Sequence, residues 1–213
     1  IANYYKIPVT IWGGGSGSQG GALSMAGGIM MDMKRMSRLI EIDEVSRTIT
    51  AEAGMIFQHL EWHANERGYS CQHIPSCLTC GTIGGALAHR GIGIMSTKYG
   101  KIDDQCLSME VVLPNGDIIN TLPVPKHAAG PDLNQIFIGS EGTLGVFTQV
   151  QLGLLPLPPS IFACTGYFDG VEAALGFVKA ARAATDDPDS PVDALAIEFF
   201  DPVNATNNVA CDY

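Results

Sequence analysis

The chain has 213 residues, of which 46% are hydrophobic, enough for one sizeable core or for one domain and part of another. Its 22 acidic and 12 basic residues give a net charge of −10, which makes nucleic acid and anionic membrane surfaces poor partners. No apolar run approaches the roughly 20 residues of a spanning helix, and no basic, apolar leader opens the chain. We therefore expect a cytoplasmic protein without an integral membrane segment, whose six cysteines are reduced thiols.

The first 157 residues are rich in glycine and in strand-like segments. Residues 1–6 are typical of the end of an interrupted helix. One longer helix is predicted over 56–67, where apolar residues recur at helical spacing and Gly68 provides a stop. Pro114-Asn115-Gly116 predicts a hairpin turn, because Asn-Gly accepts the positive φ that a tight turn needs. The predicted strands are 7–11, 29–33, 39–42, 48–51, 108–113, 117–120 and 145–152.

A proline-containing joint at 156–159 separates this region from a shorter one of ordinary α/β pattern. The order predicted there is strand 161–168, helix 171–184 and strand 194–200. We place the domain boundary at the joint, so that 1–157 form one domain and 158–213 the beginning of a second. Both ends are interpreted as truncations, and we expect exposed hydrophobic surface after the joint, because nothing covers the last apolar strand.

The sharpest motif is a run of glycine and serine directly after the first apolar strand. Glycine lets the backbone turn with positive φ and lets a ligand approach without meeting a Cβ, so successive N–H groups can converge on an anion. The run therefore predicts a phosphate-binding loop. The alternative is a flexible linker, which the position between two strands argues against. The run comprises Trp12, Gly13, Gly14, Gly15, Ser16, Gly17, Ser18, Gln19, Gly20 and Gly21.

Gly15, Gly17 and Gly20 also satisfy the dinucleotide-binding pattern G-x-G-x-x-G, which is weak evidence by itself. That pattern must open a long helix, with an acidic residue about 20 residues further on. Residues 22–28 are instead short, contain two more glycines and lead into a predicted strand. We therefore favour a diphosphate held by loops between strands over one held at a helix N-terminus.

Two further glycine-rich segments, 82–91 and 139–146, have the same character. Either segment alone could be turn chemistry. Three such segments in one domain suggest a single extended ligand that crosses several loops.

Short motifs follow one another in a fixed order: WGGGSGS at 12–18, PS at 75–76, TIGG at 82–85, KYG at 98–100, VVLPNG at 111–116, GPDL at 130–133 and GSEGTLGV at 139–146. Together they resemble the FAD-linked oxidases of the vanillyl-alcohol oxidase type, which have the p-cresol methylhydroxylase (PCMH) flavin fold. Within this family the chain is most similar to D-lactate and glycolate dehydrogenases and to alkyldihydroxyacetonephosphate synthase. The resemblance implies an α+β fold, with a PCMH-type FAD-binding domain of two α+β subdomains followed by the start of a ferredoxin-like cap domain.

The resemblance also assigns parts of the chain to FAD. The loop at 12–18 would wrap the diphosphate, 75–81 and 88–91 would line the flavin and ribityl side, and 141–147 would pack by the adenine half. The cofactor-binding residues that it implies are Trp12, Gly13, Gly14, Gly15, Ser16, Gly17, Ser18, Pro75, Ser76, Gly81, Thr82, Gly84, Gly85, Ala88, His89, Arg90, Gly91, Glu141, Gly142, Thr143, Leu144, Gly145 and Val146.

Two positions depart from the family. Many members have a histidine after the Gly-Gly-Gly that bonds covalently to the flavin. Here that position is Ser16, whose hydroxyl cannot make the bond, so we expect FAD to be held non-covalently. Relatives often have aspartate directly after the proline that stands here at position 75, and Ser76 in place of that aspartate leaves its own role open.

Other residues suggest alternatives. Cys71, Cys77 and Cys80, with His73 between them, have ligand types for zinc or iron and include a C-x-x-C redox pair. In the family this stretch faces the flavin, so a metal site is not favoured. His59 and His63 lie four residues apart on the predicted helix, where an exposed helix face is the simpler interpretation.

Two cations and a group of methionines complete the set. Arg90 and Lys98 could each bind an anion, such as an FAD phosphate or a substrate carboxylate, or be solvated. The methionines at positions 25, 30, 31, 33 and 36 are predicted to fill gaps in the core, because a thioether adapts to irregular spaces.

With FAD bound, the resemblance implies oxidation of a small 2-hydroxy acid by hydride transfer to flavin N5. An acceptor protein or a quinone would take the electrons, and a homodimer is left open. In relatives the base and the carboxylate-binding arginine lie in the cap and C-terminal parts, so the catalytic residues stay unknown and we expect no turnover from these residues alone. Two alternatives remain: an ether-lipid synthase like alkyldihydroxyacetonephosphate synthase, where flavin traps an electrophile without net oxidation, and a non-catalytic metal- or NAD-binding module.

Overall fold

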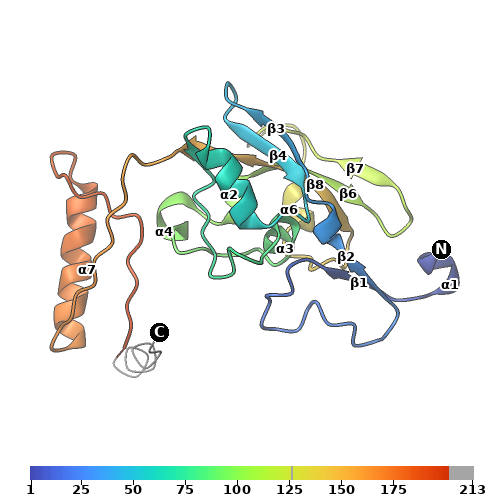
Figure 1. Ribbon diagram of the computed structural model, residues 1–213, viewed down its shortest axis with the longest axis horizontal. Helices are drawn as coiled ribbons and strands as arrows, with labels where there is room; N and C mark the ends of the chain where they lie inside the picture. Colours follow the sequence, from blue (N-terminus) through green and yellow to red (C-terminus); the bar gives the residue numbers. More distant parts are fainter. Residues whose placement is uncertain (126, 202–213) are drawn as a thin grey trace. The chain divides into compact units, whose positions relative to one another are not determined.

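The computed structural model describes residues 1–125 and 127–201. The chain forms two compact units, Ile1–Pro158 and Pro159–Tyr213, which divide within the proline-containing joint (Figure 1). The first unit contains all of the sheets described below, and the second contains one long helix.

A five-stranded antiparallel sheet lies at the centre of the first unit (Figure 1). Its spatial order is β3-β4-β8-β6-β7. All five residues of β4 are buried, and its Ile49 and Ala51 belong to the hydrophobic core. The strands are β3 Leu39–Asp43, β4 Thr48–Glu52, β6 Cys106–Val112, β7 Ile118–Asn120 and β8 Val146–Gly153.

Short helices pack against this sheet. The α2 helix, Phe57–Asn65, buries Phe57, Leu60 and Ala64, which recur at helical spacing and therefore share one face. The α3 helix, Ile83–Ala88, contacts β8, and α6, Asn134–Phe137, contacts β6. The remaining short helices of the unit are α1 Ala2–Tyr5, α4 Ser96–Tyr99 and α5 Ile102–Gln105.

A second sheet has two strands, both of which precede the strands of the large sheet in the sequence. Its strands β1, Val9–Trp12, and β2, Ile29–Asp32, are parallel and are joined by the loop 13–28, drawn in dark blue in Figure 1. The 3-10 helix η1, Met33–Arg35, follows β2. Gly54, just after β4, packs against η1 so closely that a Cβ there would lie 1.7 Å from the Met33 carbonyl oxygen. A main-chain contact therefore joins the small sheet to the large one.

A third sheet, again of two strands, completes the first unit. The β5 strand, Tyr69–Ser70, pairs antiparallel with β9, Leu155–Pro156. This pairing brings the chain that follows α2 next to the proline-containing joint.

The predicted strands of the first unit are confirmed, with ends that move by up to a few residues. The Asn-Gly hairpin is confirmed between β6 and β7, with Gly116 at φ 95°. The predicted 56–67 helix is α2 and ends earlier, at Asn65. No helix follows the G-x-G-x-x-G pattern, because residues 13–28 are turns and extended chain up to β2, so rejection of the dinucleotide fingerprint is confirmed.

Other expectations are wrong. The segment 82–91 is not a loop throughout, because α3 occupies Ile83–Ala88 and the Thr82 hydroxyl caps it by accepting from Gly85 N at 3.2 Å. The methionines of the small sheet do not fill the core: Met25, Met30 and Met31 are 87%, 47% and 40% exposed, and of the five only Met33 is buried. The two-stranded sheet leaves their side chains in solvent because no other described layer covers it.

The described part of the second unit, residues 159–201, consists of α7, Val171–Asp186, flanked by irregular chain (α7 is orange in Figure 1). The helix is confirmed, but the strands predicted at 161–168 and 194–200 are wrong. A strand needs ladder partners, and in a split β-α-β arrangement another strand lies between these two; the described residues contain none. The expected exposed hydrophobic surface is confirmed, with Phe162 91% and Tyr167 87% exposed.

The close contact at Gly54 predicts that a methyl group added at this position strongly lowers the free energy of unfolding. Gly54→Ala would place its Cβ 1.7 Å from a backbone oxygen, and we expect a loss of about 3 kcal/mol in the free energy of unfolding. Urea unfolding followed by tryptophan fluorescence reports this, because both tryptophans lie in the first unit. Gly27→Ala is the matched control: its space is open and only the left-handed φ of 68° opposes it, for a loss of about 1 kcal/mol. Equal losses would contradict the close-approach account.

Candidate functional site

A cavity of about 520 Å³ lies in the first unit, where the three glycine-rich segments meet. The loop between β1 and β2 lines one part of it, and residues between His73 and Ile92 line another. The third segment contributes Glu141, Gly142 and Gly145. Segments that are far apart in the sequence therefore share one cavity.

The structure brings most of the predicted site residues to this cavity. The exceptions are Trp12, Thr143, Leu144 and Val146. Trp12 lies against the loop itself, because a Cβ on Gly15 would be 2.2 Å from the indole ring. Thr143 donates to the Ser140 carbonyl oxygen at 2.7 Å, inside its own turn. The predicted residues that line the cavity are Gly13, Gly14, Gly15, Ser16, Gly17, Ser18, Pro75, Ser76, Gly81, Thr82, Gly84, Gly85, Ala88, His89, Arg90, Gly91, Glu141, Gly142 and Gly145.

The first loop packs directly on the turn that precedes α3. A Cβ on Gly14 would lie 2.0 Å from the carbonyl oxygen of Cys80, and 2.9 Å from the Cα of Gly81. The same turn is bonded to the start of the α2 helix, because Phe57 N donates to Gly81 O at 2.9 Å. Glycine is therefore required at position 14 for the two segments to meet.

Glu141 connects the third segment to the other two. Its backbone N–H donates to the Ala88 carbonyl oxygen at 3.0 Å, and its carboxylate pairs with His89 Nδ1 at 3.1 Å. The same carboxylate lies beside the first loop, since a Cβ on Gly21 would be 3.0 Å from Glu141 Oε2. Both side chains of the ion pair are about half exposed, so it lies at the surface of the cavity and not in the core.

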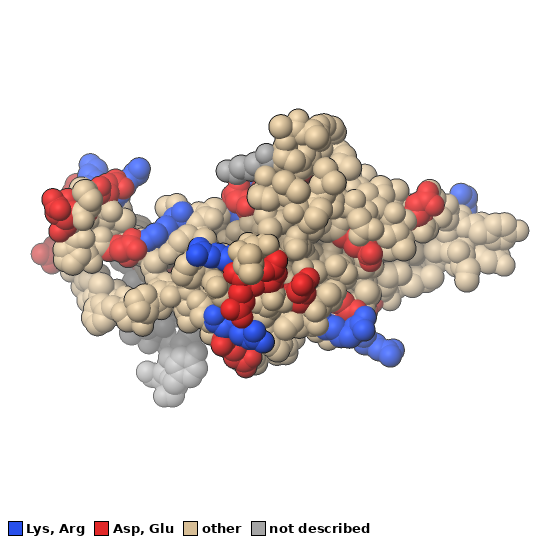
Figure 2. Space-filling view, turned by 90° about the horizontal axis from the view of Figure 1, so that it is seen from above, with Lys and Arg blue, Asp and Glu red and all other residues tan. Residues whose placement is uncertain are grey.

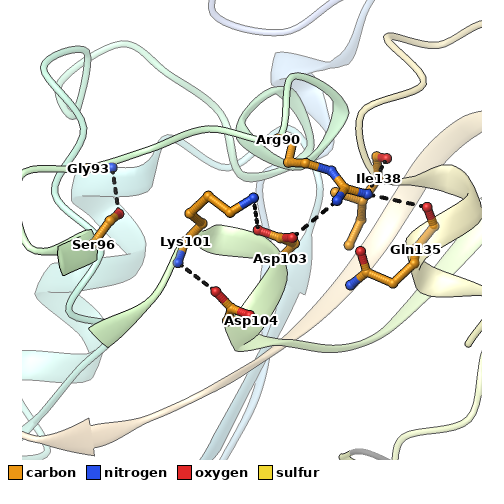
Figure 3. Close-up of polar contacts among 8 residues, drawn as sticks. All are labelled: Arg90, Gly93, Ser96, Lys101, Asp103, Asp104, Gln135 and Ile138. Carbon is orange, nitrogen blue, oxygen red and sulfur yellow. Dashed lines mark hydrogen bonds and ion pairs between the residues drawn. The ribbon is translucent and has the colours of Figure 1, made fainter. Parts of the chain in front are cut away.

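The side chain of Arg90 binds groups of the protein itself (Figure 3). Its guanidinium pairs with the buried carboxylate of Asp103 at 3.4 Å and donates to the carbonyl oxygens of Gln135 at 3.4 Å and Ile138 at 3.2 Å. Lys101 lies on the other oxygen of Asp103, also at 3.4 Å. The anion partner considered for Arg90 is therefore a side chain of this protein, and Arg90 fixes the start of the third segment.

His73 is a lining residue that the sequence did not assign to the site. Its side chain is fully buried, and neither ring nitrogen has a hydrogen-bond partner among the described residues. Burial lowers the pKa of His73 from 6.5 to about 4, so the ring is neutral at pH 7. A neutral imidazole has one N–H donor and one acceptor nitrogen, and no described residue satisfies either of them.

The remaining candidates are less specific. His59 stacks on Trp62 and His63 lies 3.9 Å from Glu66, both on α2. Across residues 1–125 and 127–201, no group of three or more His, Cys, Asp or Glu side chains is placed to hold a metal ion. On the face shown in Figure 2, Lys and Arg side chains lie next to Asp and Glu and form no continuous basic patch. No helix in the described part of the chain has the length and apolar character of a transmembrane span.

Residues 1–122 match a protein family described as an FAD binding domain. The chain belongs to this family. The FAD-binding resemblance inferred from the glycine motifs is thereby confirmed, and FAD is the cofactor of the domain. The fold class is confirmed as well: a PCMH-type FAD-binding domain of mixed α and β content.

The relatives of this FAD-binding chain are enzymes with different names. It is 35% identical over 151 residues to alkyldihydroxyacetonephosphate synthase of Caenorhabditis elegans, covering 71% of this chain and 25% of the relative. It is 32% identical over 202 residues to glycolate oxidase subunit GlcD of Bacillus subtilis, covering 94% and 42%, and 32% identical over 179 residues to D-lactate dehydrogenase of Anaerostipes hadrus, covering 84% and 38%.

A solved structure of alkyldihydroxyacetonephosphate synthase is similar to this FAD-binding chain as well, with a TM-score of 0.67 and 30% sequence identity over 75% of this chain and 29% of that one. The chain thus spans less than half the length of the relatives named here.

The lining of the cavity suits FAD. The first loop lines the cavity with four glycines among its residues 13–18, so a diphosphate could approach its main chain closely. Ile11, Met33 and Phe147 add apolar surface, as a planar ring requires. His73 adds buried ring nitrogens without partners, which a polar group of the cofactor would satisfy.

The contact at Gly14 predicts the outcome of one substitution. Gly14→Ala would place a Cβ 2.0 Å from the Cys80 carbonyl oxygen. This clash would push the first loop away from the turn that precedes α3. We expect FAD to bind at least about tenfold more weakly, a loss of about 1.4 kcal/mol, measured by flavin fluorescence titration.

Gly27→Ala is the matched control in the same loop, because nothing lies within 4 Å of its added Cβ and it does not line the cavity. We expect that variant to bind FAD as the wild type does. Equal binding by both variants would show that the Gly14 contact does not shape the site.

The neutral state of His73 predicts a pH dependence of stability. Unfolded His73 takes up a proton below pH 6.5, whereas the folded ring does so only near pH 4. The free energy of unfolding of the FAD-free protein should therefore fall by up to about 3 kcal/mol from this group as the pH is lowered between those values. His73→Gln should remove this part of the slope, and His59→Gln, at an exposed position of α2, should retain it. Identical slopes in all three proteins would rule out the buried neutral ring.

Proposed function

We propose that the protein is an FAD-dependent oxidoreductase that oxidises a small 2-hydroxy acid of the D-lactate or glycolate type. The observation that carries the proposal is the extent of the similarity to glycolate oxidase subunit GlcD. A match over 202 of the 213 residues must include most of the second unit, Pro159–Tyr213. The match to alkyldihydroxyacetonephosphate synthase is limited to 151 residues, fewer than the first unit contains.

The first loop would hold the FAD diphosphate. Residues Gly13 to Ser18 line the cavity, and hydrogen bonds from their N–H groups to phosphate oxygens would be charge-assisted. Ser16 stands where many family members have the flavin-linking histidine. Non-covalent binding of FAD follows, because a hydroxyl does not form that link.

Glu141 would lie at the nucleoside end of FAD and not beside the diphosphate. A carboxylate repels phosphate oxygens, whereas it accepts hydrogen bonds from ribose hydroxyls or from the adenine amino group. His89, 3.1 Å away, orients this carboxylate. The remaining predicted residues of the third segment, Thr143, Leu144 and Val146, would support this end from outside the cavity.

His73 would bind the polar edge of the flavin. Its neutral ring lies among apolar and glycine residues of the second segment and packs on Phe57, with ring centroids 5.1 Å apart. Pro75 and Ser76 line the cavity two and three residues further on. One hydrogen bond donated or accepted by His73 would fix the ring plane against this wall.

When bound, FAD supplies the isoalloxazine ring that accepts the hydride from the substrate carbon. The chain's own residues orient the cofactor and exclude water from its buried side. Residues 158–213, proposed as the beginning of a cap domain, would contribute to the substrate side. The expected partners are the 2-hydroxy acid and an acceptor protein or quinone; a homodimer and a cytoplasmic location stay predictions from the sequence.

A second candidate is an activity like that of alkyldihydroxyacetonephosphate synthase. It is favoured by the solved structure of that enzyme, which matches this fold with a TM-score of 0.67. Both candidates use the same FAD cavity, so they differ in the reaction and not in the cofactor site.

Anaerobic reduction distinguishes the two candidates. We expect D-lactate or glycolate to bleach the flavin absorbance of the purified full-length protein, because oxidation of a 2-hydroxy acid leaves FAD reduced. Propionate, which has the carboxylate but no hydroxyl, is the matched control and should leave the spectrum unchanged. A flavin that dithionite reduces but that neither hydroxy acid bleaches would exclude the 2-hydroxy acid proposal and favour the second candidate.

A further inference from the structure

The turn from Cys77 to Cys80 holds two thiols that the proposed cofactor chemistry does not use. Cys80 N donates to the Cys77 carbonyl oxygen at 3.0 Å, and Gly81 N donates to the same oxygen at 2.6 Å. A hydrogen bond between the first and fourth residues defines a tight turn, in which the two Cα atoms lie within about 7 Å. Disulfides join Cα atoms about 4.4–6.8 Å apart, so the backbone of this turn already has the required closeness.

The other cysteines of the first unit differ from this pair. Cys71 and Cys106 are buried, and burial raises the pKa of Cys106 to about 12 and that of Cys71 well above its ordinary value. Such thiols stay protonated and are poor nucleophiles. Cys80 is exposed and Cys77 is half-buried at the cavity wall, so these two are the reactive pair.

We propose that Cys77 and Cys80 form a reversible disulfide, which makes this wall of the cavity a site of thiol–disulfide modification. The oxidant is a low-molecular-weight disulfide. The Cys80 thiolate attacks it, forms a mixed disulfide and releases one thiolate of the oxidant. The Cys77 thiolate then attacks the Cys80 sulfur and releases the second. Two protein thiols lose two electrons and two protons, and the oxidant becomes two thiols.

The pair is connected to both walls of the cavity. The Cys77 sulfur faces Gly81, where a Cβ would be 2.9 Å away, and the Cys80 carbonyl oxygen lies against Gly14. Cys77 lines the cavity, so a bound cofactor covers it and leaves Cys80 open. Occupancy of the cavity should therefore slow the second step, a part of the inference that rests on the proposed function.

Glutathione disulfide is the probe for the test. The purified protein is incubated with it and digested with trypsin, which releases residues 68–90, a peptide that contains Cys71, Cys77 and Cys80. We expect this peptide to lose two hydrogens, and fragment ions to place the link between Cys77 and Cys80. Dithiothreitol should reverse the change.

Single substitutions separate the steps. Cys77→Ser should keep glutathione on Cys80, because the resolving thiol is absent. Cys80→Ser should react slowly and form no link. Cys71→Ser is the matched control and should form the link as the wild type does. A link to Cys71, or glutathione on both Cys77 and Cys80 of the wild type without any link, would overturn the proposal.

The cofactor-loaded and cofactor-stripped proteins complete the test. We expect FAD to slow formation of the link by at least about tenfold, because exchange requires access to the sulfur. A link that forms at the same rate in both would show that FAD does not cover Cys77, while the thiol pair itself stands. No link in either protein would refute the thiol pair and leave the proposed function untouched.

Discussion

The loop between β1 and β2 can lie against the turn before α3 only because Gly14 has no side chain. A Cβ at position 14 would be 2.0 Å from the carbonyl oxygen of Cys80. The same kind of contact joins the two sheets at Gly54. Main chain packed on main chain has few ways to adjust, since a backbone atom cannot rotate away as a side chain does. The shape of the cavity is therefore set by the fold of the loops themselves.

Side-chain pairs then hold the third segment in place. Arg90 adopts φ 55°, a left-handed conformation that costs about 1–2 kcal/mol for a residue with a Cβ. Its ion pair with buried Asp103 and its two carbonyl contacts offset that cost, because hydrogen bonds from a charged donor are stronger than neutral ones. A planar guanidinium reaches a carboxylate and two carbonyl oxygens at once, which an ammonium on a lysine does less well. Arg90 therefore acts on the cavity through the third segment that it fixes.

Local sequence predicted the parts of the fold whose partners lie close in the chain. The β6–β7 hairpin follows from Asn115-Gly116, and α2 from apolar spacing that ends before Gly68. Strands at 161–168 and 194–200 were wrong because ladder partners are a property of the whole sheet and not of a segment. The methionines show the same limit, since an apolar side chain predicts burial only where another layer covers it.

The candidate site also has a part that the local sequence predicts and a part that depends on the whole fold. Glycine loops could be recognised because a phosphate-binding turn leaves its residue types in the sequence. His73 could not be assigned to the cavity, because its isolation from hydrogen-bond partners comes from Phe57 and other residues that only the fold brings near. In the sequence His73 lies between Cys71 and Cys77, a combination of residue types that suggests metal binding. The one local signal was its place two residues before Pro75, at the edge of a stretch already assigned to the flavin side.

Cofactor site and reaction are separable in this fold. Relatives named as an alkyldihydroxyacetonephosphate synthase, a glycolate oxidase subunit and a D-lactate dehydrogenase all match at least part of the first unit, where glycine contacts, Arg90 and His73 shape the cavity that we propose for FAD. On our proposal, those residues hold the flavin, and residues covering the substrate side select what meets its reactive face. The match to glycolate oxidase subunit GlcD, which over 202 residues must extend past Pro158, then bears more on the substrate than the match to alkyldihydroxyacetonephosphate synthase over 151 residues.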